Sequence, residues 1–310
     1  MTLGCALRAP ALALAVILSI ACGSTAAKQS APVRPKLSTP ADRLLSLLPE
    51  GAQVVIELDL ARLRNNPVVG ALVTRALTTE SIRQLPGDLP MSPLGTADTL
   101  VMAAYGVGTA SAATLTLLAT TQPVEGGTTI SEGIVALGPA EWIAQVEARA
   151  GIAATSTTPL LISPQLVAMR DHAMPDQAPG ASFRLSAQLP FDARVALARQ
   201  TGLDSAPARL SIWGDVVDDL VIIVDADASD PGDRRAKHPT KRLEIAMRTM
   251  LDALSVEPAV RALGISSSLR SAKLVTRGSW LRAIIAIGPS HLRRVVERSN
   301  ALLSTLGATP

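Results

Sequence analysis

The chain has 310 residues, of which 48% are hydrophobic, 18% are charged and only 2% are aromatic, and its formal net charge is +3. This composition excludes a disordered, collagen-like or coiled-coil chain. Nucleic-acid binding needs a large basic footprint or aromatic stacking platforms, so we expect no nucleic-acid partner. The length leaves room for one large domain or two modest ones.

The first residues have the features of a secretory signal peptide, which is predicted over residues 1–21. Arg8 supplies a positive charge, and an uncharged apolar run from Ala9 to Ala21 follows. This run is shorter than the roughly 20 apolar residues of a membrane-spanning helix, and its length and flanks are typical of a cleaved signal. An ordinary signal peptide cut near Ala27 and an uncleaved anchor are the alternatives.

Cys22 stands at the point where bacterial lipoproteins carry their lipid. The segment Ala21-Cys22-Gly23-Ser24 resembles the lipobox of these proteins, although Ser19 occupies a position where leucine is usual. The resemblance implies cleavage before Cys22 and a diacylglyceryl group on its sulfur, with palmitate as the typical acyl chain. Gly23 after the cysteine resembles lipoproteins that are sorted to the outer membrane. We therefore expect a lipid-anchored protein of the bacterial cell envelope whose folded part lies in the periplasm.

Residues 22–39 are predicted to form the lipidated cysteine and a flexible tether, because the stretch is polar and rich in Ser, Ala and Pro. The other cysteine, Cys5, lies within the predicted signal peptide. The mature protein is therefore expected to contain neither a free thiol nor a disulfide, which excludes thiol catalysis and thiolate metal sites.

The folded region is predicted to start with a short helix that Thr39 caps and Pro40 opens. Alternating apolar and polar residues then predict a strand over 54–60, and Asn66-Pro67 predicts a helix that ends near Leu77. The next predicted elements are a hairpin of residues 99–107 and 113–120, a strand over 134–137 and a helix opened by Pro139.

The second half of the chain is predicted to contain two long amphipathic helices, over 239–263 and from Pro289 onward. Residues 273–277 and 280–287 are predicted to form a hairpin between them. Met174 to Gly180 is the candidate boundary between the two halves.

A short sequence repeat connects the halves. Ile134-Val135-Ala136-Leu137-Gly138-Pro139 returns 150 residues later as Ile284-Ile285-Ala286-Ile287-Gly288-Pro289. We therefore expect an α+β fold of antiparallel or mixed sheets packed by amphipathic helices. Two tandem related units, 40–174 and 180–310, are one arrangement, and a single fused domain is the other.

Glu57 and Asp59 lie two residues apart on one face of a predicted strand, so their carboxylates stand about 7 Å apart. This is near the spacing of the acid/base pairs of glycosidases. In the favoured interpretation, Asp59 caps the following turn and Glu57 faces solvent or an arginine, because the chain lacks the aromatics that usually line a sugar cleft.

Asp225, Asp227 and Asp230 place carboxylates at nearly alternate positions, as calcium loops do. The segment departs from the EF-hand frame, and a solvated strand-to-helix loop neutralised by nearby basic residues is the favoured interpretation. His172, His238 and His291 are expected to be solvated surface residues. We expect neither a metal ion nor another cofactor.

Leu48-Pro49-Glu50-Gly51-Ala52 and the segment from Val54 to Leu63 resemble the start of the folded part of uncharacterised bacterial envelope lipoproteins. The resemblance covers about residues 41–80 and implies no activity. The sequence therefore predicts a non-catalytic structural or protein-interaction role, with the membrane as partner through Cys22 and an envelope protein as a further partner. A carrier of a lipid or other apolar ligand, and a hydrolase that uses Glu57 or Asp59, are the alternatives.

Overall fold

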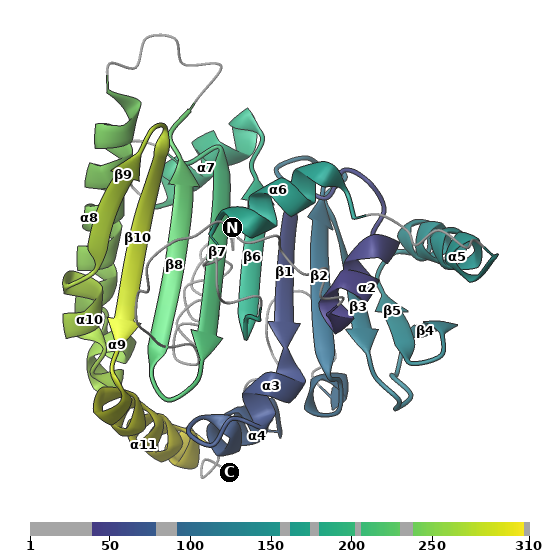
Figure 1. Ribbon diagram of the computed structural model, residues 1–310, viewed down its shortest axis with the longest axis horizontal. Coiled ribbons are helices and arrows are strands. Elements are labelled where there is room, and N and C mark those ends of the chain that lie inside the picture. The colour runs from purple at the N-terminus through teal and green to yellow at the C-terminus, as the bar shows by residue number, and fades with distance from the viewer. Residues whose placement is uncertain are drawn as a thin grey trace, which may run out of the picture.

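A computed structural model describes residues 39–78, 92–155, 162–173, 180–201, 206–229 and 238–306. These residues form one ten-stranded sheet in the order β4-β5-β3-β2-β1-β6-β7-β8-β10-β9 (Figure 1). All neighbouring strands are antiparallel. The predicted α+β class with an antiparallel sheet is confirmed. The predicted signal peptide, Cys22, and residues 174–179 of the candidate boundary lie outside the described residues.

The two halves of the chain occupy the two halves of the sheet. Read outward from the central β1–β6 pair, the strand orders β1-β2-β3-β5-β4 and β6-β7-β8-β10-β9 match. A tandem duplication would produce two matching strand orders of this kind. The duplication itself stays a prediction. The strands are β1 (Val54–Asp59), β2 (Thr99–Tyr105), β3 (Ala113–Ala119), β4 (Thr128–Ser131), β5 (Ile134–Leu137), β6 (Phe183–Gln188), β7 (Arg209–Val216), β8 (Leu220–Asp227), β9 (Lys273–Arg277) and β10 (Trp280–Ile287).

Helices connect the strands and cover the sheet. They are α2 (Pro40–Leu47), α3 (Leu60–Arg64), α4 (Gly70–Thr78), the 3₁₀ helix η2 (Ser92–Gly95), α5 (Ala140–Thr155), α6 (Pro164–His172), α7 (Phe191–Thr201), α8 (Pro239–Val256), α9 (Pro258–Leu263), α10 (Ser266–Arg270) and α11 (Pro289–Leu306). Among the described residues, none of the helices combines the length and the apolar character that crossing a membrane requires.

Local sequence signals explain several of these boundaries. Thr39 and Asp42 form the capping box that starts α2, in which each side chain accepts a hydrogen bond from the other residue's backbone N–H. The predicted hairpins are present as β2–β3 and β9–β10. Asn66 accepts hydrogen bonds from the backbone of Val68 and Val69, so it caps a turn that precedes α4 rather than the helix itself.

One predicted helix is interrupted. The stretch 239–263 forms two helices, α8 and α9, because Pro258 lacks the backbone N–H that a continuous helix needs at that position. Glu257 ends α8 in an extended conformation and leads into α9. The chain thereby turns before α10 and β9.

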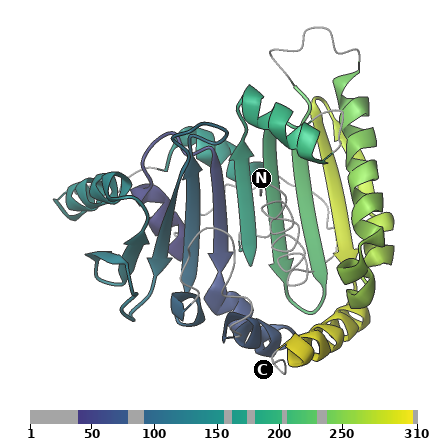
Figure 2. The ribbon, with the colours of Figure 1, turned by 180° about the vertical axis from the view of Figure 1, so that it is seen from behind.

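The helices pack on opposite faces of the two halves. In the first half, α2, α5 and α6 cover the face turned toward the viewer in Figure 1, hereafter the front face, and Leu44, Leu115 and Val146 are among the residues of that core. In the second half, α8 to α11 contribute to the core on the back face, with Ile222 and Leu281 of the sheet (Figure 2). The front face of the second half instead carries the end of α6 and a smaller apolar cluster of Ala173, Trp213 and Ile223.

Gly214 of β7 lies opposite Phe183 of β6. A Cβ added at Gly214 would stand 2.1 Å from the phenyl ring, which is buried in the core. We expect Gly214→Ala to lower the free energy of unfolding by about 1–3 kcal/mol because the core must shift to accommodate the methyl group. Urea denaturation measures this difference.

The matched control is Gly151→Ala in α5, where an added Cβ meets no atom within 4 Å. That variant is expected to be as stable as the parent protein or up to about 1 kcal/mol more stable. Equal stability of the parent and Gly214→Ala would show that Phe183 does not pack against this strand as described.

Candidate functional site

Carboxylates are buried on the front face of the sheet. The strand β8 alternates Ile222 and Ala226, which face the back core, with Asp225 and Asp227, which face the front. Asp215 of β7 and Glu57 of β1 are buried on the same front face. Because an unpaired buried carboxylate is very costly, each of these groups needs a cation or several hydrogen bonds.

Arg170 of α6 neutralises Glu57. Its Nε donates to both carboxylate oxygens of Glu57, at 2.8 and 3.0 Å, and its Nη1 donates to Oδ1 of Asp42 at 2.6 Å. Burial disfavours the charged form of Arg170, but the attraction of Glu57 and then of Asp42 outweighs it, so the pKa of Arg170 is raised above its ordinary value. The guanidinium therefore ties α6 to both β1 and α2.

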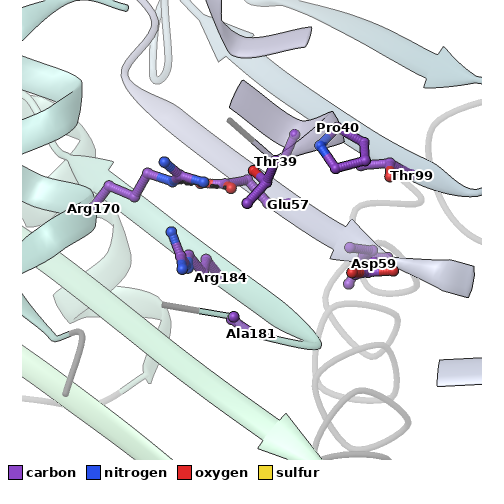
Figure 3. Close-up of a pocket in the computed structure, with 11 residues that line it drawn as sticks. Thr39, Pro40, Glu57, Asp59, Thr99, Arg170, Ala181 and Arg184 are labelled. Carbon is purple, nitrogen blue, oxygen red and sulfur yellow. Dashed lines mark hydrogen bonds and ion pairs between the residues drawn. The ribbon is translucent and has the colours of Figure 1, made fainter. Parts of the chain in front are cut away.

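A small cavity lies beside this ion pair. Its volume is about 40 Å³, and Glu57, Asp59, Arg170 and Arg184 are among its lining residues. Figure 3 shows Arg170 reaching toward Glu57, with Arg184 on the neighbouring strand and Asp59 farther along β1. A second cavity, near Pro49 and Leu166, has about 30 Å³. Each has space for a few water molecules, whereas pockets for small organic ligands have about 300–1,000 Å³.

Arg62 of α3 neutralises Asp215. Its Nε donates to Oδ1 of Asp215 at 2.8 Å, and the hydroxyl of Ser182 donates to the same oxygen at 2.9 Å. The backbone N–H of Val216 in turn donates to the Ser182 hydroxyl. This chain of hydrogen bonds links the helix after β1 to the strand β7 in the second half of the sheet.

Asp225 binds both an arginine and a histidine. Arg282 of β10 donates from Nε to Oδ1 at 2.8 Å and from Nη2 to Oδ2 at 2.6 Å, and Nδ1 of His172 lies 2.8 Å from Oδ2. An ionised carboxylate can only accept hydrogen bonds, so Nδ1 of His172 carries the proton of this bond. The imidazole also stacks on Trp280, with 3.6 Å between ring centroids.

Asp227 binds Arg209 of β7 and Ser229. Arg209 donates to its Oδ2 from Nε, at 2.8 Å, and from Nη2, and the Ser229 hydroxyl donates to the same oxygen at 2.6 Å. Burial alone would raise the pKa of Asp227, but the hydrogen bonds from Ser229 and the contact with Arg209 lower it below its ordinary value. The carboxylate is therefore held in its charged form.

The candidate pair Glu57 and Asp59 makes different contacts in the structure, although both residues line the small cavity. Glu57 faces an arginine, Arg170, and not solvent. Asp59 caps α3 by accepting a hydrogen bond from the backbone N–H of Arg62 at 2.8 Å. The two carboxylates therefore take part in separate structural contacts, one in an ion pair and one in a helix cap.

The interpretation of Asp225 and Asp227 as residues of a solvated loop was wrong. Both belong to β8 and are 1% exposed. Asp230 lies outside the described residues. Within the part of the chain that the structure describes, no group of three or more His, Cys, Asp or Glu side chains is placed to hold a metal ion. The oxygens of Asp225 and Asp227 bind arginine, histidine and serine instead.

Two of the three histidines differ from the sequence interpretation, because His172 and His291 are only partly exposed and make polar contacts. His172 ends the helix α6 and contacts Asp225 and Trp280, so it is not a simple solvated side chain. Nε2 of His291 lies 2.8 Å from the carbonyl oxygen of Gly264. His238 is exposed, as expected, and precedes α8 in a left-handed conformation with φ at 59°.

The particular arginine partners of the buried carboxylates were not predicted from the sequence. Arg282 is the one charged residue within the apolar run of β10, and Asp225 interrupts the apolar run of β8. Single opposite charges in two apolar strands indicate a cross-strand ion pair. Assigning Arg282 to Asp225 also requires knowing that β10 pairs with β8 and in which register. Arg170 had no comparable signal, because α6 was not predicted as a helix.

Comparisons with known proteins do not identify a family. No protein-family model matches the sequence, and no curated protein matches it. Among solved structures, the chain is similar to crystal form I of TP0453, with 10% sequence identity and a TM-score of 0.41. The match covers 82% of this chain and 97% of that chain. A similarity at this level does not establish a shared function.

The Glu57–Arg170 pair can be tested by removing its cation. We expect Arg170→Met to lower the free energy of unfolding by about 3–5 kcal/mol, because it leaves the buried Glu57 carboxylate without its cation. The double variant Glu57→Leu with Arg170→Met is expected to be more stable than Arg170→Met alone. Denaturant unfolding of both variants tests this order.

Arg43→Met is the control, since Arg43 is an exposed arginine on α2. It is expected to change the free energy of unfolding by less than about 0.5 kcal/mol. If the double variant is less stable than Arg170→Met alone, the loss does not come from an uncompensated Glu57.

Proposed function

We propose that the protein is a bacterial envelope lipoprotein, anchored at the outer membrane through a lipid on Cys22, whose folded part acts in the periplasm as a non-catalytic interaction module. The observation that carries this proposal is the position of Cys22. It follows a short apolar run and precedes a polar stretch, and the described fold begins shortly afterwards, at the capping box of Thr39.

The distance between lipid and fold supports an anchored arrangement. Cys22 and Thr39 are 17 positions apart in the sequence. A tether of this length spans about 20 Å on average and at most about 60 Å. Two or three acyl chains, at about 0.8 kcal/mol per buried methylene, would make membrane attachment effectively permanent. The folded part would then act close to the membrane surface.

The chemistry of the front face supports recognition rather than catalysis. Glu57, Asp215, Asp225 and Asp227 are all bound to arginines, so their oxygens are committed to contacts that fix the fold. A general acid or base instead needs a free proton-transfer position and a pKa near the working pH. Arg209 is nevertheless partly exposed above its buried aspartate, which leaves it available to a partner.

The lipid anchor is tested by metabolic labelling with an alkyne analogue of palmitate in bacterial cells that process lipoproteins. We expect the parent protein and Cys5→Ser to be labelled and to sediment with membranes, whereas Cys22→Ser is unlabelled and released. Cys5→Ser is the matched control, because Cys5 lies within the predicted signal peptide. Equal labelling and sedimentation of Cys22→Ser would refute the anchor.

The interaction role is tested by photo-crosslinking in intact cells. A photoreactive amino acid placed at position 277, an exposed site on β9, is expected to give adducts of defined mass with an envelope protein. The same amino acid at Ile245 of α8, which is 55% exposed, is the control and is expected to give none of these adducts. A protein that remains free of adducts at position 277, or gives the same pattern at both positions, contradicts the proposal.

A further inference from the structure

Four side chains form one row at an end of the sheet. The strand β7 begins at Arg209, β8 ends at Asp227, and β10 begins at Trp280. The strand register places these residues side by side and adds Arg277, the last residue of the edge strand β9 (Figure 1). Residues directly opposite on neighbouring strands project from the same face. The row therefore places two arginines on the two sides of Trp280, on the front face.

Arg209 is fixed in position but retains free hydrogen-bonding capacity. Asp227 holds its Nε and Nη2, and the guanidinium carbon lies 5.2 Å from the centre of the Trp280 ring. No described residue accepts a hydrogen bond from its Nη1, and 45% of the side chain is exposed. An arginine that is already oriented loses little conformational freedom when it binds an anion.

His172 adds a third nitrogen group next to Trp280. The imidazole stacks on the indole ring, and its Nδ1 binds Asp225. Its Nε2 makes no hydrogen bond with any described residue, and 35% of the side chain is exposed. Asp225 also holds Arg282, so buried aspartates orient the histidine and two of the three arginines.

We propose that Arg209, Arg277, Trp280 and His172 form a binding site for a monocarboxylate with an apolar or ring-shaped body. A guanidinium matches a carboxylate in geometry and charge, and the partly exposed indole, beyond the face on which His172 stacks, offers apolar surface to the rest of the ligand. The charged residues at and beneath the site are Arg209, Arg277, Arg282, Asp225 and Asp227. Their charges sum to +1 when His172 is counted as neutral. One positive charge suits a singly charged carboxylate better than a phosphate dianion beside two buried aspartates.

The site goes beyond the proposed function, because a soluble carboxylate binds here whether or not Cys22 carries a lipid. A single carboxylate of this kind occurs at the C-terminus of a peptide and on an acidic sugar. N-acetyl-leucine and glucuronate represent these two sources, and N-acetyl-leucinamide and glucose are their neutral counterparts.

Isothermal titration of the full chain in detergent micelles tests the site with these four compounds and with phenyl phosphate. We expect at least one carboxylate to bind at least about tenfold more tightly than its neutral counterpart, because a charge-assisted hydrogen bond is lost in the neutral compound. The carboxylate that binds identifies the source. We expect phenyl phosphate to bind more weakly than that carboxylate.

Arg277→Gln is expected to weaken carboxylate binding about threefold, as is typical of one exposed charge. Trp280→Leu is expected to weaken it further, through loss of the ring surface. Arg293→Gln, at an exposed position on α11, makes the same charge change elsewhere and is expected to bind like the parent protein. Arg277 is an exposed side chain at the end of the edge strand β9, so we expect Arg277→Gln to fold like the parent protein and to stay informative even if Trp280→Leu is unstable.

Three outcomes overturn the proposal. One is equal affinity for the carboxylates and their neutral counterparts, which includes the absence of binding by all of them. A second is tighter binding of phenyl phosphate. The third is an equal loss of affinity in Arg277→Gln and Arg293→Gln, which would indicate attraction by overall charge rather than a site at Trp280.

Discussion

Buried carboxylates that must be neutralised determine how the front face of this sheet is built. Removing an ionised carboxylate from water costs far more than one ordinary hydrogen bond returns, so such a group persists in a fold only beside a cation or with several hydrogen bonds. Each of the four has an arginine from a different element. The pairs are Glu57 with Arg170, Asp215 with Arg62, Asp225 with Arg282 and Asp227 with Arg209. The positions of α3 and α6 against the sheet follow from two of these pairs.

The same contacts hold the two halves of the sheet together. The strands β1 and β6 pair along the middle, and α6 spans this line, because Arg170 binds Glu57 in the first half while His172 binds Asp225 in the second. The Asn66 side chain, which follows α3, donates to the carbonyl oxygens of Val216 and Val217. Polar contacts across the centre therefore supplement the backbone ladder, and they depend on exact side-chain placement more than an apolar contact does.

Sequence patterns predicted those features that depend on neighbouring residues. The helix cap at Thr39, the cap at Asp59 and the two hairpins are all determined by residues within one turn or one loop, so a single sequence contains the necessary information. The ion pairs are different. Arg170 and Glu57 are 113 positions apart, and Arg62 and Asp215 are 153 positions apart. Only the strand order and the packing of α3 and α6 on the sheet bring such residues together.

The error at Asp225 and Asp227 has a specific physical cause. Oxygen ligands at every second position are a feature of calcium loops, but a strand with one polar face has the same period of two. The flanking residues distinguish the two cases, because Ile222, Val224 and Ala226 form the complementary apolar face that a strand requires and a calcium loop does not. Weighing that apolar face would have predicted buried aspartates and a need for basic partners.

The arginines of the second half have two different roles because of where their aspartates lie. Arg282 is largely covered, with 21% of its side chain exposed, and it fixes β10 to β8 and to the end of α6. Arg209 sits at the start of its strand, so its buried aspartate holds one edge of the guanidinium while much of the side chain remains exposed. A carboxylate buried at a strand end thus turns an arginine into an oriented, accessible cation, and an adjacent indole adds an apolar surface. This combination connects the requirement for charge neutralisation inside the fold with recognition at its surface.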